Sequence, residues 1–119
     1  MVTVYLMTKK TKSEKMQKVK KIILLHLKEC EPCEEFKNIF EQVANLDKYN
    51  GISFESYDIA NDEGSKLVEK YQVHGIPTAL LLDANDETTS KIIGSIEKEE
   101  FIELINDCLN TQEGEENDN

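Results

Sequence analysis

Two cysteines separated by two residues, in the segment Cys30-Glu31-Pro32-Cys33, are the side chains best suited to chemistry. An apolar run at residues 22–27 precedes them, and a helical pattern begins at the second cysteine. If the run is a strand, both sulfurs lie at a strand-to-helix junction, where unpaired N–H groups and the helix dipole favour a thiolate. The spacing also allows a disulfide within one turn. We therefore expect reversible two-electron exchange between a dithiol and a disulfide.

The chain has three cysteines, an odd number. A small secreted protein held by disulfides would use an even set, whereas a close pair with one extra cysteine suits a reducing compartment. The extra one, Cys108, shares a helical face with Phe101, Leu104 and Ile105, so we interpret it as a small buried hydrophobe. No apolar stretch approaches the ~18–20 residues that cross a bilayer, and residues 1–7 make a poor signal peptide. We expect a cytoplasmic protein.

The net charge of −10 is spread unevenly over the 119 residues. Residues 8–21 contain seven lysines and one glutamate, a balance of +6, so the remainder of the chain carries −16. The lysine run lacks arginine and interleaved aromatic side chains, and an acidic protein repels polyanions. We interpret the run as a solvated helix face and expect no nucleic-acid partner.

The elements that must position the two cysteines follow from apolar periodicity and turn residues. Strands are predicted at residues 2–7, 22–27, 52–59, 78–83 and 90–93, and helices at residues 11–19, 33 to about 48, about 63–71 and 98–109. Strands and helices alternate in the first half, and a hairpin with a final helix follows, which indicates a mixed sheet with helices on both faces. Residues 112–119 have no apolar side chain. We predict one domain at residues 1–110 and an acidic, disordered tail at residues 111–119.

Over most of its length the chain resembles the thioredoxin family. Three landmarks carry the resemblance: the two-cysteine segment after the central strand, Val-His-Gly-Ile-Pro-Thr at residues 73–78, and Ile93-Gly94 at the end of the last strand. Pro77 lies 44 residues beyond Cys33, a separation similar to that in the family. The resemblance implies an α/β thioredoxin fold, with a central mixed five-stranded sheet flanked by four helices.

The resemblance also implies a binding groove for an extended partner segment. In the family, the peptide bond corresponding to Ile76–Pro77 is cis, and the backbone before the proline pairs with the partner as an added strand. Gly94 resembles the family glycine that lets partner backbone approach closely. His74 borders this groove, so we include it among the substrate-binding residues.

In the mechanism that the resemblance implies, Cys30 is the nucleophile and Cys33 resolves the mixed disulfide. Pro32 suits the first turn of a helix, where its missing N–H costs nothing, and it restrains the loop between the sulfurs. Glu29 replaces the usual tryptophan before the first cysteine, and Glu31 replaces the usual glycine after it. With Glu34 and Glu35 nearby, these carboxylates oppose the thiolate. We expect Cys30 to be a less acidic, more reducing thiol than in a typical thioredoxin.

The proton-handling partners of the family are also replaced. Leu24 occupies the position of the buried aspartate that relays protons for the second cysteine, and Ser56 that of its accompanying lysine. Cys33 then needs water or another base, for which Glu29 and Asp58 are conceivable, and we predict slow resolution. His26 is interpreted as a packed histidine in the place of a family aromatic residue.

The function expected from this resemblance is a protein-disulfide reductase in cell redox homeostasis. It would act as a monomer on protein substrates, use no cofactor beyond the redox-active Cys30–Cys33 disulfide, and take electrons from an unidentified reductase. An alternative is a thioredoxin-fold binding module with weak or vestigial redox activity that docks a basic partner. A metal site is also conceivable, because two cysteines form half of a zinc or iron–sulfur site. Only His74 could approach as a further ligand, so we expect no metal unless a dimer bridges one.

Overall fold

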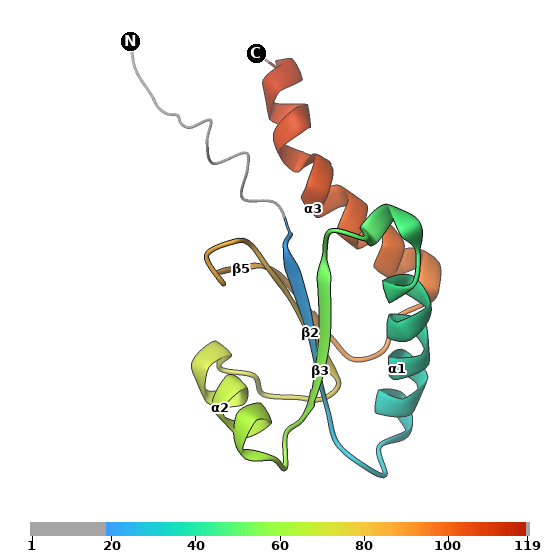
Figure 1. Cartoon of the computed structure of the whole chain (residues 1–119), viewed down its shortest axis with the longest axis vertical. Coiled ribbons are helices and arrows are strands. Elements are labelled where there is room, and N and C mark those ends of the chain that lie inside the picture. Colours follow the sequence, from blue (N-terminus) through green and yellow to red (C-terminus); the bar gives the residue numbers. More distant parts are fainter. Residues whose placement is uncertain (1–18, 119) are drawn as a thin grey trace.

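A central sheet with helices packed on its two faces makes up the computed structural model, which describes residues 19–118 (Figure 1). The elements in chain order are β2 (Lys21–His26), α1 (Glu31–Ala44), the 3-10 helix η2 (Asp47–Tyr49), β3 (Ser53–Asp58), α2 (Asp62–Tyr71), β4 (Thr78–Leu82), β5 (Thr88–Ile93) and α3 (Lys98–Asp118). The strand predicted at residues 2–7 lies outside the described residues, as does the helix predicted at 11–19 except for its last residue, Val19. None of the helices in residues 19–118 has the length and apolar character that a membrane span requires.

The described sheet has four strands in the order β3-β2-β4-β5. Strand β2 runs parallel to β3 and antiparallel to β4, and β4 runs antiparallel to β5. The four inner residues of β2 are all buried, because the strand is paired on both edges and covered on both faces. The mixed sheet with helices on both faces, as predicted, is confirmed.

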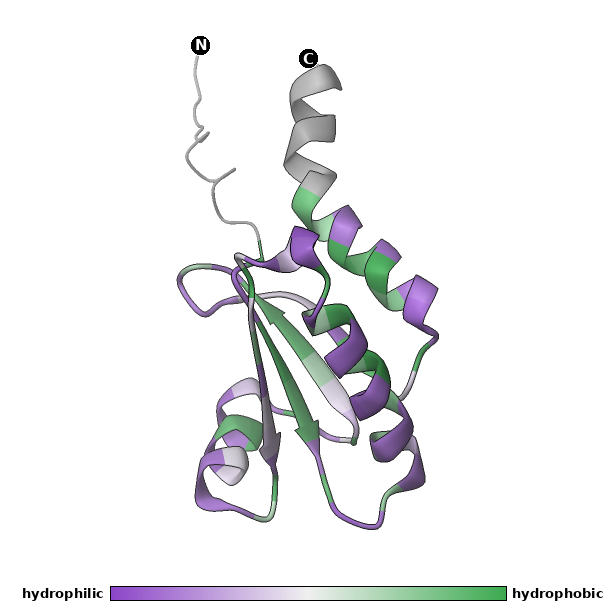
Figure 2. Ribbon diagram, turned by 45° about the vertical axis from the view of Figure 1, so that its right-hand side comes forward, coloured by the Kyte–Doolittle hydropathy of each residue, from purple (hydrophilic) through white to green (hydrophobic). Residues whose placement is uncertain are grey.

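Two apolar cores lie on the two faces of the sheet (Figure 2). On one face, α1 and α3 pack together on β2, and the rings of Phe36 and Phe101 meet edge to face with centroids 5.2 Å apart. On the other face, α2 covers Ile23 and Leu25 with Leu67 and other apolar side chains. Because successive residues of a strand point to opposite faces, β2 contributes to both cores. This packing fixes the N-terminus of α1 relative to the carboxyl end of β2.

Several boundaries differ from those predicted. Helix α1 ends at Ala44, and the separate turn η2 follows it. Strand β5 begins at Thr88 rather than at Ser90. Helix α3 continues to Asp118 instead of ending at Leu109, while the disordered tail predicted for residues 111–119 stays a prediction. Glutamate and glutamine are good helix formers, so a helix anchored by its apolar first part can extend into a polar sequence. The domain boundary at residue 110 stays a prediction.

Candidate active site

The two closely spaced cysteines form a disulfide at the N-terminus of α1, with their Cα atoms 5.2 Å apart. Cys30 is the N-cap residue, in an extended conformation, and its Sγ accepts a hydrogen bond of 3.2 Å from the N–H of Cys33. Pro32 lies in the first helical turn, where no carbonyl is available to its missing N–H. The predicted pairing is therefore confirmed. The catalytic roles of the two sulfurs stay predictions.

The two sulfurs differ in exposure. Cys33 is 2 % exposed, whereas Cys30 is half-buried. A partner disulfide would therefore reach Cys30 first. The four surrounding carboxylates, which we call the acidic rim, are all exposed and belong to Glu29, Glu31, Glu34 and Glu35. Glu29 has a positive φ of 58°, a region that L-residues adopt uncommonly, so the chain turns sharply just before Cys30.

The chain segment that ends at Pro77 enters β4 at the end of the sheet where the loop with the cysteines leaves β2. The peptide bond between Ile76 and Pro77 is cis, as predicted. The Pro77 carbonyl accepts a hydrogen bond of 2.8 Å from the N–H of Gly94, which has a φ of 91°. In the antiparallel register, Thr78 lies opposite Leu25, near the end of β2. Pro77 is buried and Ile76 half-buried.

His74 is exposed and borders a shallow pocket with Ile76, on the side of the sheet that α2 covers. The roles of Ile76, Pro77, Gly94 and His74 in binding a partner stay predictions. Within residues 19–118, no group of three histidine, cysteine or acidic side chains is arranged to hold a metal ion. Cys108 is half-buried against the first core, and burial raises the pKa of its thiol.

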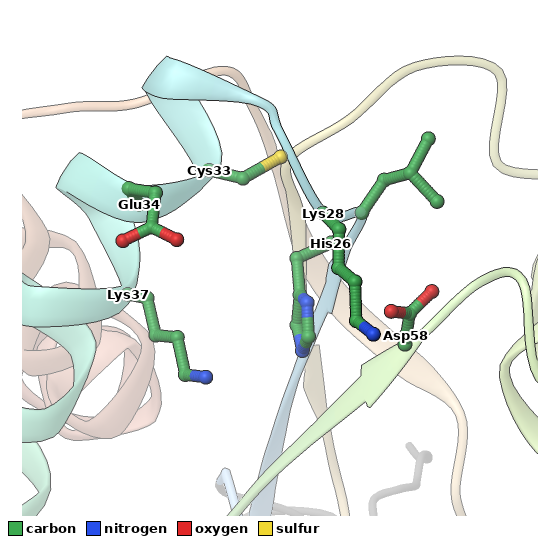
Figure 3. A pocket seen from close by; sticks show the side chains of 7 residues that line it. His26, Lys28, Cys33, Glu34, Lys37 and Asp58 are labelled. Carbon is green, nitrogen blue, oxygen red and sulfur yellow. The ribbon is translucent and has the colours of Figure 1, made fainter.

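A second cavity lies behind the disulfide, between the first turns of α1 and the carboxyl ends of β2 and β3 (Figure 3). Its lining comprises His26, Leu27, Lys28, Cys33, Glu34, Lys37 and Asp58. His26 and Asp58 are the last residues of β2 and β3, and they lie side by side in the parallel register. Leu24, at the family position of the buried acid, is fully buried in the first core.

The cavity gives His26 a position that the sequence does not predict. His26 was interpreted as a packed substitute for an aromatic residue, but it shares this cavity with the sulfur of Cys33. Burial lowers the pKa of His26, and Lys37 lowers it further, while Asp58 and Glu34 act in the opposite direction. One signal was available in the sequence. His26 lies two residues beyond Leu24 and so on the same face of the strand, nearer to the cysteines.

A family model described as a thioredoxin-like domain matches residues 7–109 of the chain. Among solved structures, a thioredoxin of Malassezia sympodialis is similar, with a TM-score of 0.65 and 16 % identity over 82 % of this chain and 83 % of that one. Thioredoxin O2 of Arabidopsis thaliana, in its oxidised state, has a TM-score of 0.63 and 17 % identity over 78 % and 79 % of the two chains. At these identities the likeness concerns the fold. None of the curated proteins matches this chain in sequence.

Proposed function

Because the chain belongs to the family of thioredoxin-like domains, we propose that it is a thiol–disulfide oxidoreductase that reduces disulfides of partner proteins. One observation carries this proposal: the disulfide between a half-buried Cys30 and a buried Cys33 at the N-terminus of α1. A partially exposed sulfur at a helix N-terminus is suited to nucleophilic attack, and a neighbouring sulfur can complete the exchange.

In the proposed reaction, the reduced protein transfers two electrons to its partner. The Cys30 thiolate attacks one sulfur of the partner's disulfide, and the other partner sulfur leaves as a thiolate. The Cys33 thiolate then attacks Cys30 Sγ in the mixed disulfide and releases the second partner sulfur, which leaves a Cys30–Cys33 disulfide. No cofactor takes part. A separate reductase, not yet identified, must return the two electrons.

The partner is proposed to bind as an extended segment along the backbone of Ile76, beside Pro77, Gly94 and His74. Edge pairing of this kind supplies main-chain hydrogen bonds that do not depend on the partner's sequence. We further propose that the protein acts in the cytoplasm, because a reducing compartment keeps a dithiol reduced. It is proposed to act as a monomer. Neither a nucleic acid nor a membrane is part of the proposal.

Reduction of insulin in the presence of dithiothreitol tests the proposal. The protein should accelerate precipitation of the insulin B chain, and Cys30→Ser should abolish the acceleration. Cys33→Ser should accumulate a mixed disulfide with insulin that mass spectrometry detects. Cys108→Ser is the matched control, since Cys108 lies away from the disulfide, and it should retain the acceleration. A rate equal to that of dithiothreitol alone would refute the proposed activity.

The acidic rim favours a second candidate function, a binding module that docks a basic partner. Four exposed carboxylates beside the disulfide would attract a cationic segment, and added salt would weaken the attraction. Binding of a basic peptide that weakens with salt and survives the double change Cys30→Ser, Cys33→Ser would support this candidate. Loss of binding in the double variant would favour the redox function.

A further inference from the structure

We propose that the imidazole of His26 accepts the proton of the Cys33 thiol when the mixed disulfide on Cys30 is resolved. The proposal rests on the redox function above and adds a proton acceptor to it. Cys33 is 2 % exposed, so bulk water has little access to its thiol. The attacking species must nevertheless be the thiolate. A base on the inner side of the sulfur is therefore needed.

The cavity behind the disulfide supplies this base. It has a volume of about 140 Å³, and both Cys33 and His26 line it. In Figure 3 the imidazole leaves the end of β2 below the Cys33 sulfur, and the Lys28 side chain lies between the ring and Asp58, all of them bordering the same cavity. Leu24 points to the same face of the sheet but is enclosed in the first core. The strand thus places a titratable side chain in the cavity that Cys33 also lines, two residues later than the family position.

The other candidate bases are less well placed. Glu29 is exposed and does not line the cavity. Asp58 lines the cavity, but its Oδ1 accepts a hydrogen bond of 2.8 Å from the N–H of Ala60 at the end of β3. A neutral imidazole is in general a stronger base than a carboxylate, because its reference pKa is higher. Asp58 is better suited to stabilise the imidazolium that forms.

The charges around the imidazole come from each element that borders it. Lys28 lies on the loop, Glu34 and Lys37 on α1, and Asp58 on β3. Burial and Lys37 lower the pKa of His26, so the ring is neutral and able to accept a proton at physiological pH. After the transfer, Asp58 and Glu34 act in favour of the charged ring.

The step conserves protons and electrons. The proton passes from Cys33 Sγ to the imidazole, and the Cys33 thiolate attacks Cys30 Sγ. The bond between Cys30 Sγ and the partner sulfur breaks, and the partner sulfur leaves with the bonding pair as a thiolate. That thiolate then takes up the proton from the imidazolium or from water. The protein is oxidised to its disulfide, and the partner is reduced.

Stopped-flow reaction of the reduced protein with excess 5,5′-dithiobis(2-nitrobenzoate) isolates this step. In a Cys108→Ser background, nitrothiobenzoate should be released in two equal phases: attack by Cys30, which depends on reagent concentration, and resolution by Cys33, which does not. His26→Gln should slow the second phase by about 10²-fold and leave the first unchanged. Glu41→Gln, an exposed change further along α1, is the control and should alter neither phase.

The pH profile of the second phase separates proton transfer from a structural role. In the Cys108→Ser parent, the rate should rise with pH through an inflection below 6.5, whereas in His26→Gln this inflection should be lost. Asp58→Asn removes a charge that raises the pKa of His26, so the inflection should move to lower pH. Lys37→Gln removes a charge that lowers it, so the inflection should move to higher pH.

Two results would overturn the proposal. One is a rate of the second phase in His26→Gln that stays within about twofold of the parent rate across the pH range. The other is a pH inflection that fails to move in opposite directions in Asp58→Asn and Lys37→Gln. The latter two variants keep His26 and so test the proposal even if His26→Gln does not fold. Absence of a second phase in the parent, together with no reduction of insulin, would instead refute the redox function on which the proposal rests.

Discussion

The carboxylates next to Cys30 act against the helix N-terminus at which its sulfur lies. Glu31 and Glu34 are both in the first turn of α1, and both are exposed. A negative charge about 7 Å from a thiolate opposes it by ~0.6 kcal/mol when water screens fully, and by more when the surroundings are less polar. We therefore expect the two residues to make the Cys30 thiolate less abundant than the helix N-terminus alone would allow.

Neutralising these two charges should make Cys30 more reactive. In the reduced protein, Glu31→Gln with Glu34→Gln should raise the rate of Cys30 alkylation by iodoacetamide at pH 7 and low salt by about threefold or more. Salt should reduce the difference. Glu99→Gln, an exposed change in the first turn of α3, is the control. Equal alkylation rates in all three proteins would show that the rim does not tune Cys30.

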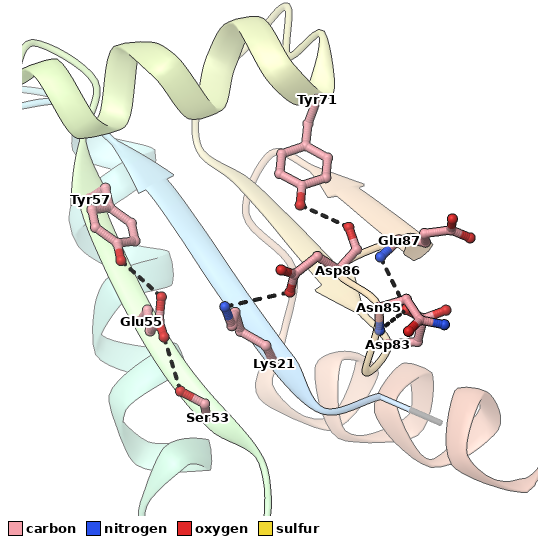
Figure 4. Close-up of polar contacts among 9 residues, drawn as sticks. All are labelled: Lys21, Ser53, Glu55, Tyr57, Tyr71, Asp83, Asn85, Asp86 and Glu87. Atoms are coloured by element: carbon pink, nitrogen blue, oxygen red, sulfur yellow. Dashed lines mark hydrogen bonds and ion pairs between the residues drawn. The ribbon is translucent and has the colours of Figure 1, made fainter. Parts of the chain in front are cut away.

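Between elements, one buried hydroxyl ties the turn after α1 to α3. Tyr49, in η2, is 2 % exposed, and its Oη donates a hydrogen bond of 2.6 Å to Oδ1 of Asn106. Tyr57, in β3, also donates from Oη, over 2.9 Å to Glu55, but its side chain is only half-buried (Figure 4). The two tyrosines therefore allow a comparison, although they differ both in access to water and in the acceptor, which is an amide for Tyr49 and a carboxylate for Tyr57.

Removal of each hydroxyl should cost different amounts of stability. Tyr49→Phe removes a buried hydroxyl and leaves the half-buried oxygen of Asn106 without this donor, so it should lower the free energy of unfolding by about 1 kcal/mol. Tyr57→Phe should lower it by less than about 0.5 kcal/mol, since water can replace the hydroxyl. Urea denaturation of both variants and the parent measures the difference. If Tyr49→Phe were as stable as the parent, the hydrogen bond between η2 and α3 would make no significant contribution to stability.

Local sequence patterns predict most of the helices and strands, but they do not predict the cavity behind the disulfide. The apolar run of β2 and the three- and four-residue spacing in α1 predict a buried strand and an amphipathic helix. The Cys30–Cys33 pair and the segment before Pro77 are short motifs that can be read directly. The meeting of His26, Asp58 and Cys33 depends instead on the β2–β3 register and on how α1 packs on the sheet. Both are contacts between residues distant in the sequence, which periodicity does not encode.

Over the whole molecule, the charge of −10 should govern which disulfides reach Cys30 fastest. Residues 8–21 carry a balance of +6, so the rest of the chain carries −16, and the acidic rim places four of these charges around the site. An electrostatic field of this kind raises the local concentration of cations and lowers that of anions. The effect is on the encounter rate, so it should appear in the bimolecular step alone.

The reduced protein should therefore react faster with cystamine, a dication, than with dithiodiglycolate, a dianion. Each rate is divided by that of free dithiothreitol with the same disulfide, so that intrinsic reactivity cancels. At low ionic strength we expect a normalised preference of about tenfold or more, which should shrink towards unity in ~1 M salt, where the screening length is about 3 Å. Neutral hydroxyethyl disulfide is the control, and its rate should change little with salt. A preference that persisted in salt would mean that contacts at the site, rather than the field of the whole protein, select the partner.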